Sequence, residues 1–163
     1  RPHQGIALSR GRRMNINNHD YDLIKLGFEG EQAITADLFF KYGRTFQARQ
    51  IILREGDKGN EVYLIIAGKV VVTERVNQGK YRVLNSLGPG EIFGEMAMLE
   101  NAPRSATLIA ASPTKLLSLT QENFEKIFQS HPRWAFKILV ALGRRIQSAF
   151  RQVEGYYRGS ANQ

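Results

Sequence analysis

The chain has 163 residues, of which 42% are hydrophobic, and its formal net charge is +8. A chain of this length forms one domain around one core. It has no cysteine, which excludes disulfides, thiolate–zinc sites and iron–sulfur clusters. Its longest apolar run, residues 134–142, is interrupted by Lys137 and is too short to span a bilayer. We therefore expect no transmembrane segment, and without a secretory signal pattern we expect a cytoplasmic location.

Basic charge is concentrated at the two ends. Residues 1–20 carry four Arg and one Asp, residues 21–131 carry 13 basic and 13 acidic side chains, and residues 132–163 carry six basic and one acidic. Basic ends can contact nucleic acid, anionic lipid or an acidic protein, although most charge runs are solvated tails and helix faces. Since the first residue is Arg and not Met, we expect a piece or a processed form of a longer chain.

The N-terminal part predicts a flexible leader followed by a helix. Residues 1–29 are basic and contain several Gly and Asn, which is typical of a flexible segment. Residues 30–42 place apolar side chains at helical spacing and are followed by Gly43.

The middle of the chain changes to short β-branched runs separated by turn residues. The predicted strands are residues 46–48, 51–54, 62–66, 70–76, 81–87, 106–110 and 115–119, with a hairpin link at 77–80. Many short strands with glycine between them predict a β-sandwich or jelly roll. The predicted core residues are Ile51, Leu64, Ile66, Val70, Val72, Leu108 and Leu116.

Two helices are predicted after the strands. Thr120 can cap a helix through Phe128. Pro132 suits the first turn of a longer helix, predicted over residues 132–157, which leaves a tail at 158–163. An apolar stripe along it needs a cover, which could be the sheets, a second copy in a homodimer, or both. The stripe consists of Leu139, Leu142, Ile146, Ala149, Val153 and Tyr157.

The most informative stretch is residues 93–107, between two strand-like runs. Gly94 lets backbone approach a ligand. A short helix starting near Glu95 would aim backbone N–H groups at an anion, and the carboxylate could accept from a sugar hydroxyl. Arg104 offers a fork of donors suited to a phosphate. These residues predict a sugar-phosphate ligand. No nucleophile–base pairing is evident, so we expect a binding protein and not an enzyme.

The order F-G-E-hydrophobic-small, followed by R-S-A, resembles the phosphate-binding cassette of cyclic-nucleotide-binding domains. It is met by residues 93–97 and 104–106, and further landmarks of the family are matched at 55–57, 63–65, 68–70 and 87–91. The resemblance covers about residues 36–155. It implies a domain at residues 30–157 that is mainly β with flanking helices: an eight-stranded jelly roll, an N-terminal helix and two C-terminal helices.

The resemblance also implies roles for single residues. Glu95 would hold the ribose 2′-hydroxyl and Arg104 the cyclic phosphate, while Ser105 would add a hydroxyl. Two alternatives are a ligand-free salt bridge between Glu95 and Arg104, and Ser105 as an ordinary turn residue. The implied ligand is cAMP, with cGMP open because of Ser105, and no metal or catalytic cofactor is expected. The predicted ligand-binding residues are Gly94, Glu95, Met96, Ala97, Arg104, Ser105 and Ala106.

A second group of candidates would contact the base or close over it: Val72, Leu84, Phe93, Arg145 and Phe150. Val72 and Leu84 could equally be plain core, and Arg145 a solvated helix residue. In the catabolite-activator branch of the family, two hydroxyl residues touch adenine where this chain has Ala149 and Phe150. We therefore expect an apolar lid formed by Phe150 or a neighbour, without polar readout of the base at these two positions.

The predicted function is a regulatory sensor domain that transmits ligand binding through movement of its C-terminal helix to a protein effector or an attached domain. One alternative is the sensor half of a catabolite-activator-type transcription regulator without its DNA-binding domain. Another is a regulatory fragment of a channel or a multidomain enzyme. Because only a short tail follows the long helix, we expect no DNA binding by this chain alone. His3, His19 and His131 lie outside the predicted roll, which argues against a metal-dependent jelly-roll enzyme.

Overall fold

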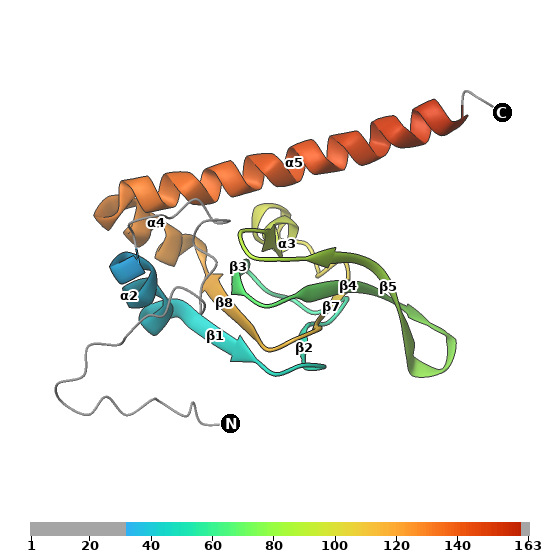
Figure 1. The fold of residues 1–163 in the computed structure, drawn as a ribbon, viewed down its shortest axis with the longest axis horizontal. Coiled ribbons are helices and arrows are strands. Elements are labelled where there is room, and N and C mark those ends of the chain that lie inside the picture. Colours follow the sequence, from blue (N-terminus) through green and yellow to red (C-terminus); the bar gives the residue numbers. More distant parts are fainter. Residues whose placement is uncertain (1–31, 161–163) are drawn as a thin grey trace.

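The computed structural model describes residues 32–160, so the predicted leader at 1–29 and the last three residues of the tail lie outside it. The helices are α2 (Gln32–Tyr42), α3 (Glu95–Glu100), α4 (Gln121–Ser130) and α5 (Pro132–Ser160). The strands are β1 (Gly43–Phe46), β2 (Ile51–Leu53), β3 (Val62–Ala67), β4 (Val70–Val76), β5 (Lys80–Leu87), β6 (Ile92–Phe93), β7 (Thr107–Ala110) and β8 (Thr114–Leu119). Two β-sheets form a roll, two helices (α2 and α4) lie at one end of it, a short helix (α3) lies between the roll and the middle of α5, and the long helix α5 runs above the roll (Figure 1).

The predicted fold class is confirmed. The first sheet has the strand order β1-β8-β3-β6 and the second the order β2-β7-β4-β5, and their neighbouring strands pair antiparallel. β1 begins earlier than predicted, at Gly43, because it pairs with β8 along its whole length. The two-residue strand β6 was not among the predicted runs, since two residues carry no periodic signal. The predicted hairpin link between β4 and β5 is present and contains a 3₁₀ turn, η1 (Asn77–Gly79).

β3 is the centre of the packing. Its alternate residues Val62, Leu64 and Ile66 face a cluster that includes side chains of α2, α4 and α5. Tyr63 and Ile65 belong to a second cluster with residues of both sheets. A strand buried on both faces reads as a continuous apolar run, as β3 does. Of the predicted core, five residues are buried, while Ile51 and Val72 are half-buried.

α4 and α5 begin as predicted, with the Thr120 side chain accepting from the Asn123 backbone N–H at 3.2 Å. Much of the apolar stripe predicted along α5 is not covered by the described part of the chain. Trp134, Ala135 and Ile138 are buried instead, and the Trp134 indole donates to Thr35 Oγ1 at 3.3 Å. Because α2 and α4 hold the start of α5, they set its rotation. Of the predicted stripe, Leu142 is partly buried, but Leu139, Ile146 and Val153 are 44%, 59% and 53% exposed.

Beyond its first turns α5 continues over the roll toward the long β4–β5 hairpin (Figure 1). Among residues 32–160, no helix combines the length and the apolar character needed to cross a membrane.

Candidate ligand-binding site

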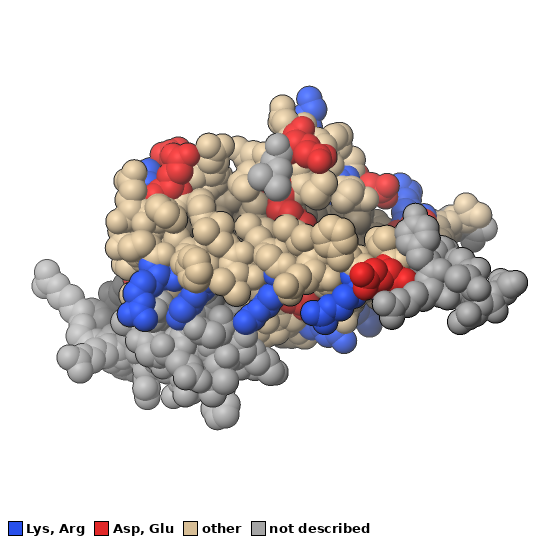
Figure 2. Space-filling model, turned by 90° about the horizontal axis from the view of Figure 1, so that it is seen from above, with Lys and Arg blue, Asp and Glu red and all other residues tan. Residues whose placement is uncertain are grey.

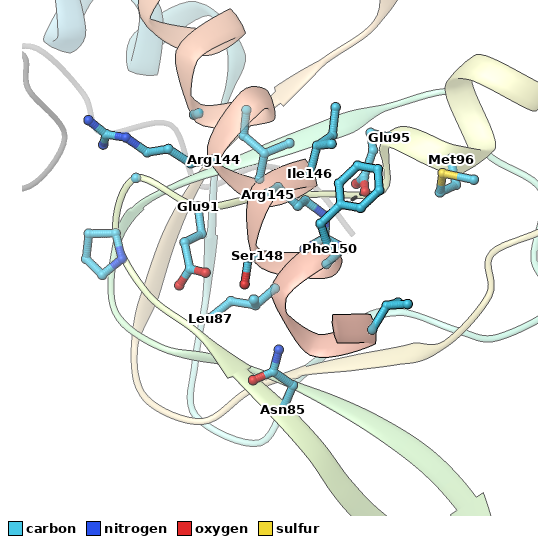
Figure 3. A pocket seen from close by; sticks show the side chains of 16 residues that line it. Asn85, Leu87, Glu91, Glu95, Met96, Arg144, Arg145, Ile146, Ser148 and Phe150 are labelled. Atoms are coloured by element: carbon cyan, nitrogen blue, oxygen red, sulfur yellow. Dashed lines mark hydrogen bonds and ion pairs between the residues drawn. The ribbon is translucent and has the colours of Figure 1, made fainter. Parts of the chain in front are cut away.

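Two adjoining cavities lie between the roll and α5. The smaller one, of about 70 Å³, is bounded by the predicted cassette together with Val72 of β4 and Arg145 of α5. The larger one, of about 580 Å³, opens between the β5–β6 segment and α5 (Figure 3). Glu95, Met96 and Arg145 line both cavities. The smaller space is well below the roughly 300–1,000 Å³ of typical small-molecule pockets, so a nucleotide bound there has to extend into the larger one.

Arg104 presents a buried cation at the bottom of the smaller cavity. The residue is 4% exposed. Its Nη1 donates to the backbone carbonyls of Glu61 at 2.9 Å and Gly94 at 3.0 Å, and its Nη2 lies 3.5 Å from Glu61 Oε2. The guanidinium carbon also lies 5.7 Å from the centroid of the Tyr63 ring. The internal Glu95–Arg104 salt bridge weighed above does not form, because Glu61 is the carboxylate that partners Arg104.

Two glycines leave the space that this guanidinium occupies. A Cβ on Gly94 would lie 2.8 Å from Arg104 Nη1, and Gly94 has a φ of +84°, which L side chains rarely adopt. A Cβ on Gly59 would lie 2.6 Å from Arg104 Nη2. The Arg104 backbone is also fixed, since its N–H donates to Asp57 O at 2.9 Å. The guanidinium is therefore preorganised on the floor of the cavity.

Tyr63 supports Arg104 from below. Its ring stacks on Phe93 with centroids 5.1 Å apart and an interplanar angle of 15°. Burial raises the pKa of the Tyr63 phenol, and the negative charge of Glu61 raises it further. Tyr63 is therefore a neutral ring under the cation, and it adds cation–π stabilisation without a second formal charge.

Glu95 joins the cassette to α5. Its Oε1 accepts a hydrogen bond from Arg145 Nε at 2.5 Å. Its Oε2 is buried and has no hydrogen-bond partner within the described part of the chain. An unsatisfied buried carboxylate oxygen costs free energy, and a hydroxyl donor in the cavity would satisfy it. The site thus combines a buried cation with an acceptor that lacks a donor, which suits a sugar phosphate.

The structure brings most of the predicted site residues together. All seven predicted ligand-binding residues line the smaller cavity, and so do Val72, Phe93 and Arg145 of the second predicted group. Ala97 is buried, whereas Met96 and Ser105 are exposed. Phe150 lines the larger cavity and is 67% exposed, so it does not close over the site in this conformation.

Leu84 is the predicted residue that the structure leaves outside both cavities. The pairing of β4 with β5 shifts between Val72 and Thr73: Val72 pairs with Asn85, and Thr73 pairs with Val83. Leu84 is the extra residue of this bulge and is 56% exposed.

Sequence reasoning missed several residues of the site, among them Gly59, Glu61, Asn85 and Ser148. Gly59 and Glu61 precede β3 and meet Arg104 only through the fold, so no local pattern connects them. Asn85 and Ser148 line the larger cavity. Asn85 could not be found from strand alternation, because a bulge changes which residues face the cavity.

Comparison with known proteins agrees with this geometry. The family model for the cyclic nucleotide-binding domain matches residues 43–131, more than half of the chain. The chain is 35% identical over 124 residues to the cyclic AMP receptor protein of Thermus thermophilus, covering 75% of this chain and 57% of that protein. It is 38% identical over 85 residues to the cAMP-dependent protein kinase regulatory subunit of Dictyostelium discoideum, covering 50% and 26%. It therefore spans little more than half of the first relative and about a quarter of the second.

Solved structures give the same result. The crystal structure of the Thermus thermophilus catabolite activator protein aligns with a TM-score of 0.59 and 32% identity, covering 81% of this chain and 63% of that one. A cyclic nucleotide-binding domain from Methylobacillus flagellatus aligns with a TM-score of 0.56 and 29% identity, covering 74% and 67%. The resemblance seen in the cassette is confirmed, and the chain belongs to the cyclic nucleotide-binding domain family.

Proposed function

We propose that this chain is a cAMP-binding sensor domain whose α5 helix reports ligand binding. The observation that carries the proposal is the buried Arg104 guanidinium beside the unpartnered Oε2 of Glu95 in one cavity. Two of the similar proteins named above are a cyclic AMP receptor and a regulatory subunit of a cAMP-dependent kinase. cGMP is the second candidate, because the Ser105 hydroxyl can serve either nucleotide.

In the proposed complex the cyclic phosphate lies against Arg104 and Ser105. The ribose 2′-hydroxyl donates to Glu95 Oε2, whose Oε1 already accepts from Arg145. The base then extends into the larger cavity, where Ile146, Phe150 and Val153 of α5 offer apolar surface. Each of the three parts of the nucleotide thus meets a matching chemical group.

Removing the Arg104 side chain tests the phosphate contact. In Arg104→Ala the binding free energy for cAMP should fall by about 2–5 kcal/mol, because the phosphate loses a buried charge partner. Arg44→Ala is the matched control: Arg44 Nη2 pairs with the same Glu61 carboxylate at 3.3 Å but is exposed, so the loss should be at most about 1 kcal/mol. Calorimetric titration of protein freed of bound nucleotide measures both. If the unmodified chain binds neither cAMP nor cGMP, the proposal is refuted.

The ribose contact is tested by pairing a protein change with a ligand change. Glu95→Ala should weaken cAMP binding by about 1.5–3 kcal/mol, the range for hydrogen bonds to charged groups. For 2′-deoxy-cAMP the same substitution should cost much less, because the hydroxyl is already missing. Glu100→Ala, which removes the other glutamate of α3 at its exposed end, is the control. Equal losses for both ligands would show that Glu95 does not hold the 2′-hydroxyl.

The proposed transmission uses the arrangement of α5. Its first turns are buried against α2 and α4, whereas its middle crosses the open cavity and contacts the cassette through Arg145 and Glu95. A ligand that contacts both walls stabilises a position of α5 closer to the roll. Only a difference in affinity between the open and closed positions can drive that shift. An effector or an attached domain would read the movement, as in the sensor half of a transcription regulator or a regulatory fragment of a larger protein.

Movement of α5 can be measured directly because the chain has no native cysteine. Spin labels on Arg75→Cys and Glu154→Cys, both exposed residues on β4 and α5, should move closer together when cAMP saturates the protein. A pair on Lys58→Cys and Arg75→Cys, both within the roll, should keep its distance. An unchanged distance between β4 and α5 at saturation would contradict the lid movement.

We also propose that α5 pairs with α5 of a second copy. Apolar residues alternate by three and four positions along its uncovered face, which is the heptad spacing of a coiled coil. They are Phe136, Leu139, Ile146, Phe150 and Val153, with Gly143 between them. Ile146, Phe150 and Val153 also line the larger cavity, so in the proposed dimer they would border both the base and the second copy. Figure 2 looks down on α5 and shows an uncharged band bordered along one edge by Lys and Arg. The exposed basic residues Arg133, Arg144 and Arg151 recur along α5 at helical spacing, so they lie on one side of the helix, next to this band.

Light scattering tests the pairing. The unmodified chain should have twice the 18.5 kDa mass of one copy, and Ile146→Glu combined with Val153→Glu should reduce it to one copy, because two like charges would face each other in the apolar seam. Arg151→Gln, beside the seam, should leave the mass doubled. A single-copy mass for the unmodified chain at all concentrations would rule out pairing through α5.

A further inference from the structure

An oxidisable side chain lies at the boundary between the two cavities. Met96 lines both of them and is 47% exposed. The chain has no cysteine, so its only sulfur groups are the thioethers of its three methionines. We propose that Met96 is a modification site at which a peroxide converts the thioether to a sulfoxide, and that this sulfoxide weakens the binding of a cyclic nucleotide. The effect on binding rests on the proposed function, whereas the assignment of Met96 as the modified residue does not.

The short helix α3 gives its two methionines different surroundings. Met96 and Met98 are two positions apart, which is about 200° around a helix, so they lie on opposite faces of α3. Met98 is partly buried and packs against the core cluster that contains side chains of α2, α4 and α5. Met14, the third methionine of the chain, lies outside the described residues. Because oxidation requires access to the sulfur, Met96 should react faster than Met98.

The oxidation step requires no reagent other than the peroxide. The thioether sulfur of Met96 attacks one oxygen of hydrogen peroxide, the O–O bond breaks, and an S–O bond forms. The sulfur is oxidised by two electrons and the peroxide is reduced, so that its second oxygen leaves as water after proton transfer. The product is methionine sulfoxide, a polar side chain that methionine sulfoxide reductases convert back to the thioether. The change from apolar to polar at Met96 is therefore reversible.

The groups near Met96 make an added acceptor oxygen unfavourable once a ligand is bound. Figure 3 shows Glu95 and Met96 at the same end of the larger cavity. Glu95 already has a buried oxygen, Oε2, without a hydrogen-bond partner within the described part of the chain. In the free protein, water can hydrate an exposed sulfoxide. A nucleotide that spans both cavities would displace this water, and its phosphate, like the Glu95 carboxylate, has no hydrogen to donate. Burial of a polar group without a partner costs free energy, so the sulfoxide should weaken binding.

Peptide mass spectrometry tests the site of modification. The full chain is exposed to hydrogen peroxide, and the gain of one oxygen is followed separately at Met96 and Met98. Met96 should be oxidised several-fold faster, with Met98 as the internal reference. Saturating cAMP should slow the reaction at Met96, because the contact that a sulfoxide would disturb also covers the sulfur. Equal rates at the two methionines, or a faster reaction at Met98, would refute Met96 as the preferred site.

Calorimetric titration of cAMP before and after peroxide treatment tests the effect on binding. The double variant Met14→Leu, Met98→Leu keeps Met96 as its sole methionine. In this variant peroxide should weaken cAMP binding about tenfold, the size expected for one polar group buried without a partner, and methionine sulfoxide reductases should restore it. Met96→Leu keeps the other two methionines. Whatever its own starting affinity, peroxide should change it by less than about twofold.

The outcomes separate this inference from the sensor function. If Met96 is oxidised but the sole-methionine variant binds cAMP as tightly as before, the effect on binding is refuted and the sensor function stands. The same holds if Met96→Leu loses as much affinity on oxidation as the unmodified chain. If the unoxidised chain binds neither cAMP nor cGMP, the proposed function fails, while mass spectrometry still decides whether Met96 is the modified residue.

Discussion

The structure depends on placing one buried arginine. A guanidinium inside a protein is costly unless hydrogen bonds and an opposite charge compensate for the lost water. Arg104 meets that requirement with two backbone carbonyls, the Glu61 carboxylate and the face of Tyr63. These partners come from the segment before β3, from β3 itself and from the turn before α3. The strand at the centre of the core therefore also holds the charge at the centre of the site.

The space that the Arg104 guanidinium needs explains why two residues without side chains border the cavity. Gly59 and Gly94 leave the room in which the guanidinium lies, and a side chain at either position would collide with it. The compensation of Arg104 by the protein is nevertheless weak on one side, since its Nη2 is 3.5 Å from the Glu61 carboxylate. An anion that enters the cavity adds a further partner to a cation whose position is already set. Preorganised donors of this kind bind an anion without a large cost of rearrangement.

A second ion pair gives the site its link to the rest of the molecule. Arg145 reaches from the middle of α5 to Glu95 at the start of α3. The first turns of α5 are packed against α2 and α4, but its apolar face beyond them has no cover among the described residues. A helix that is held at one end and linked in its middle to the Glu95 carboxylate of the candidate site can respond to changes there. Its uncovered face offers a surface through which the response could reach a second copy.

The sequence by itself determined the fold class and the cassette. Short strands, capped helices and the closely spaced residues 93–107 carry local signals, because strand periodicity, capping and the F-G-E and R-S-A motifs each lie within a few positions. Tertiary structure alone decided which groups meet over long separations: Glu61 with Arg104, Val72 with Asn85, and Arg145 with Glu95. It also decided the rotation of α5, which α2 and α4 set through Trp134, and the exclusion of Leu84 from the site by a bulge. A bulge and a helix rotation are settled by packing between distant elements, and that packing leaves no mark in the local pattern of residues.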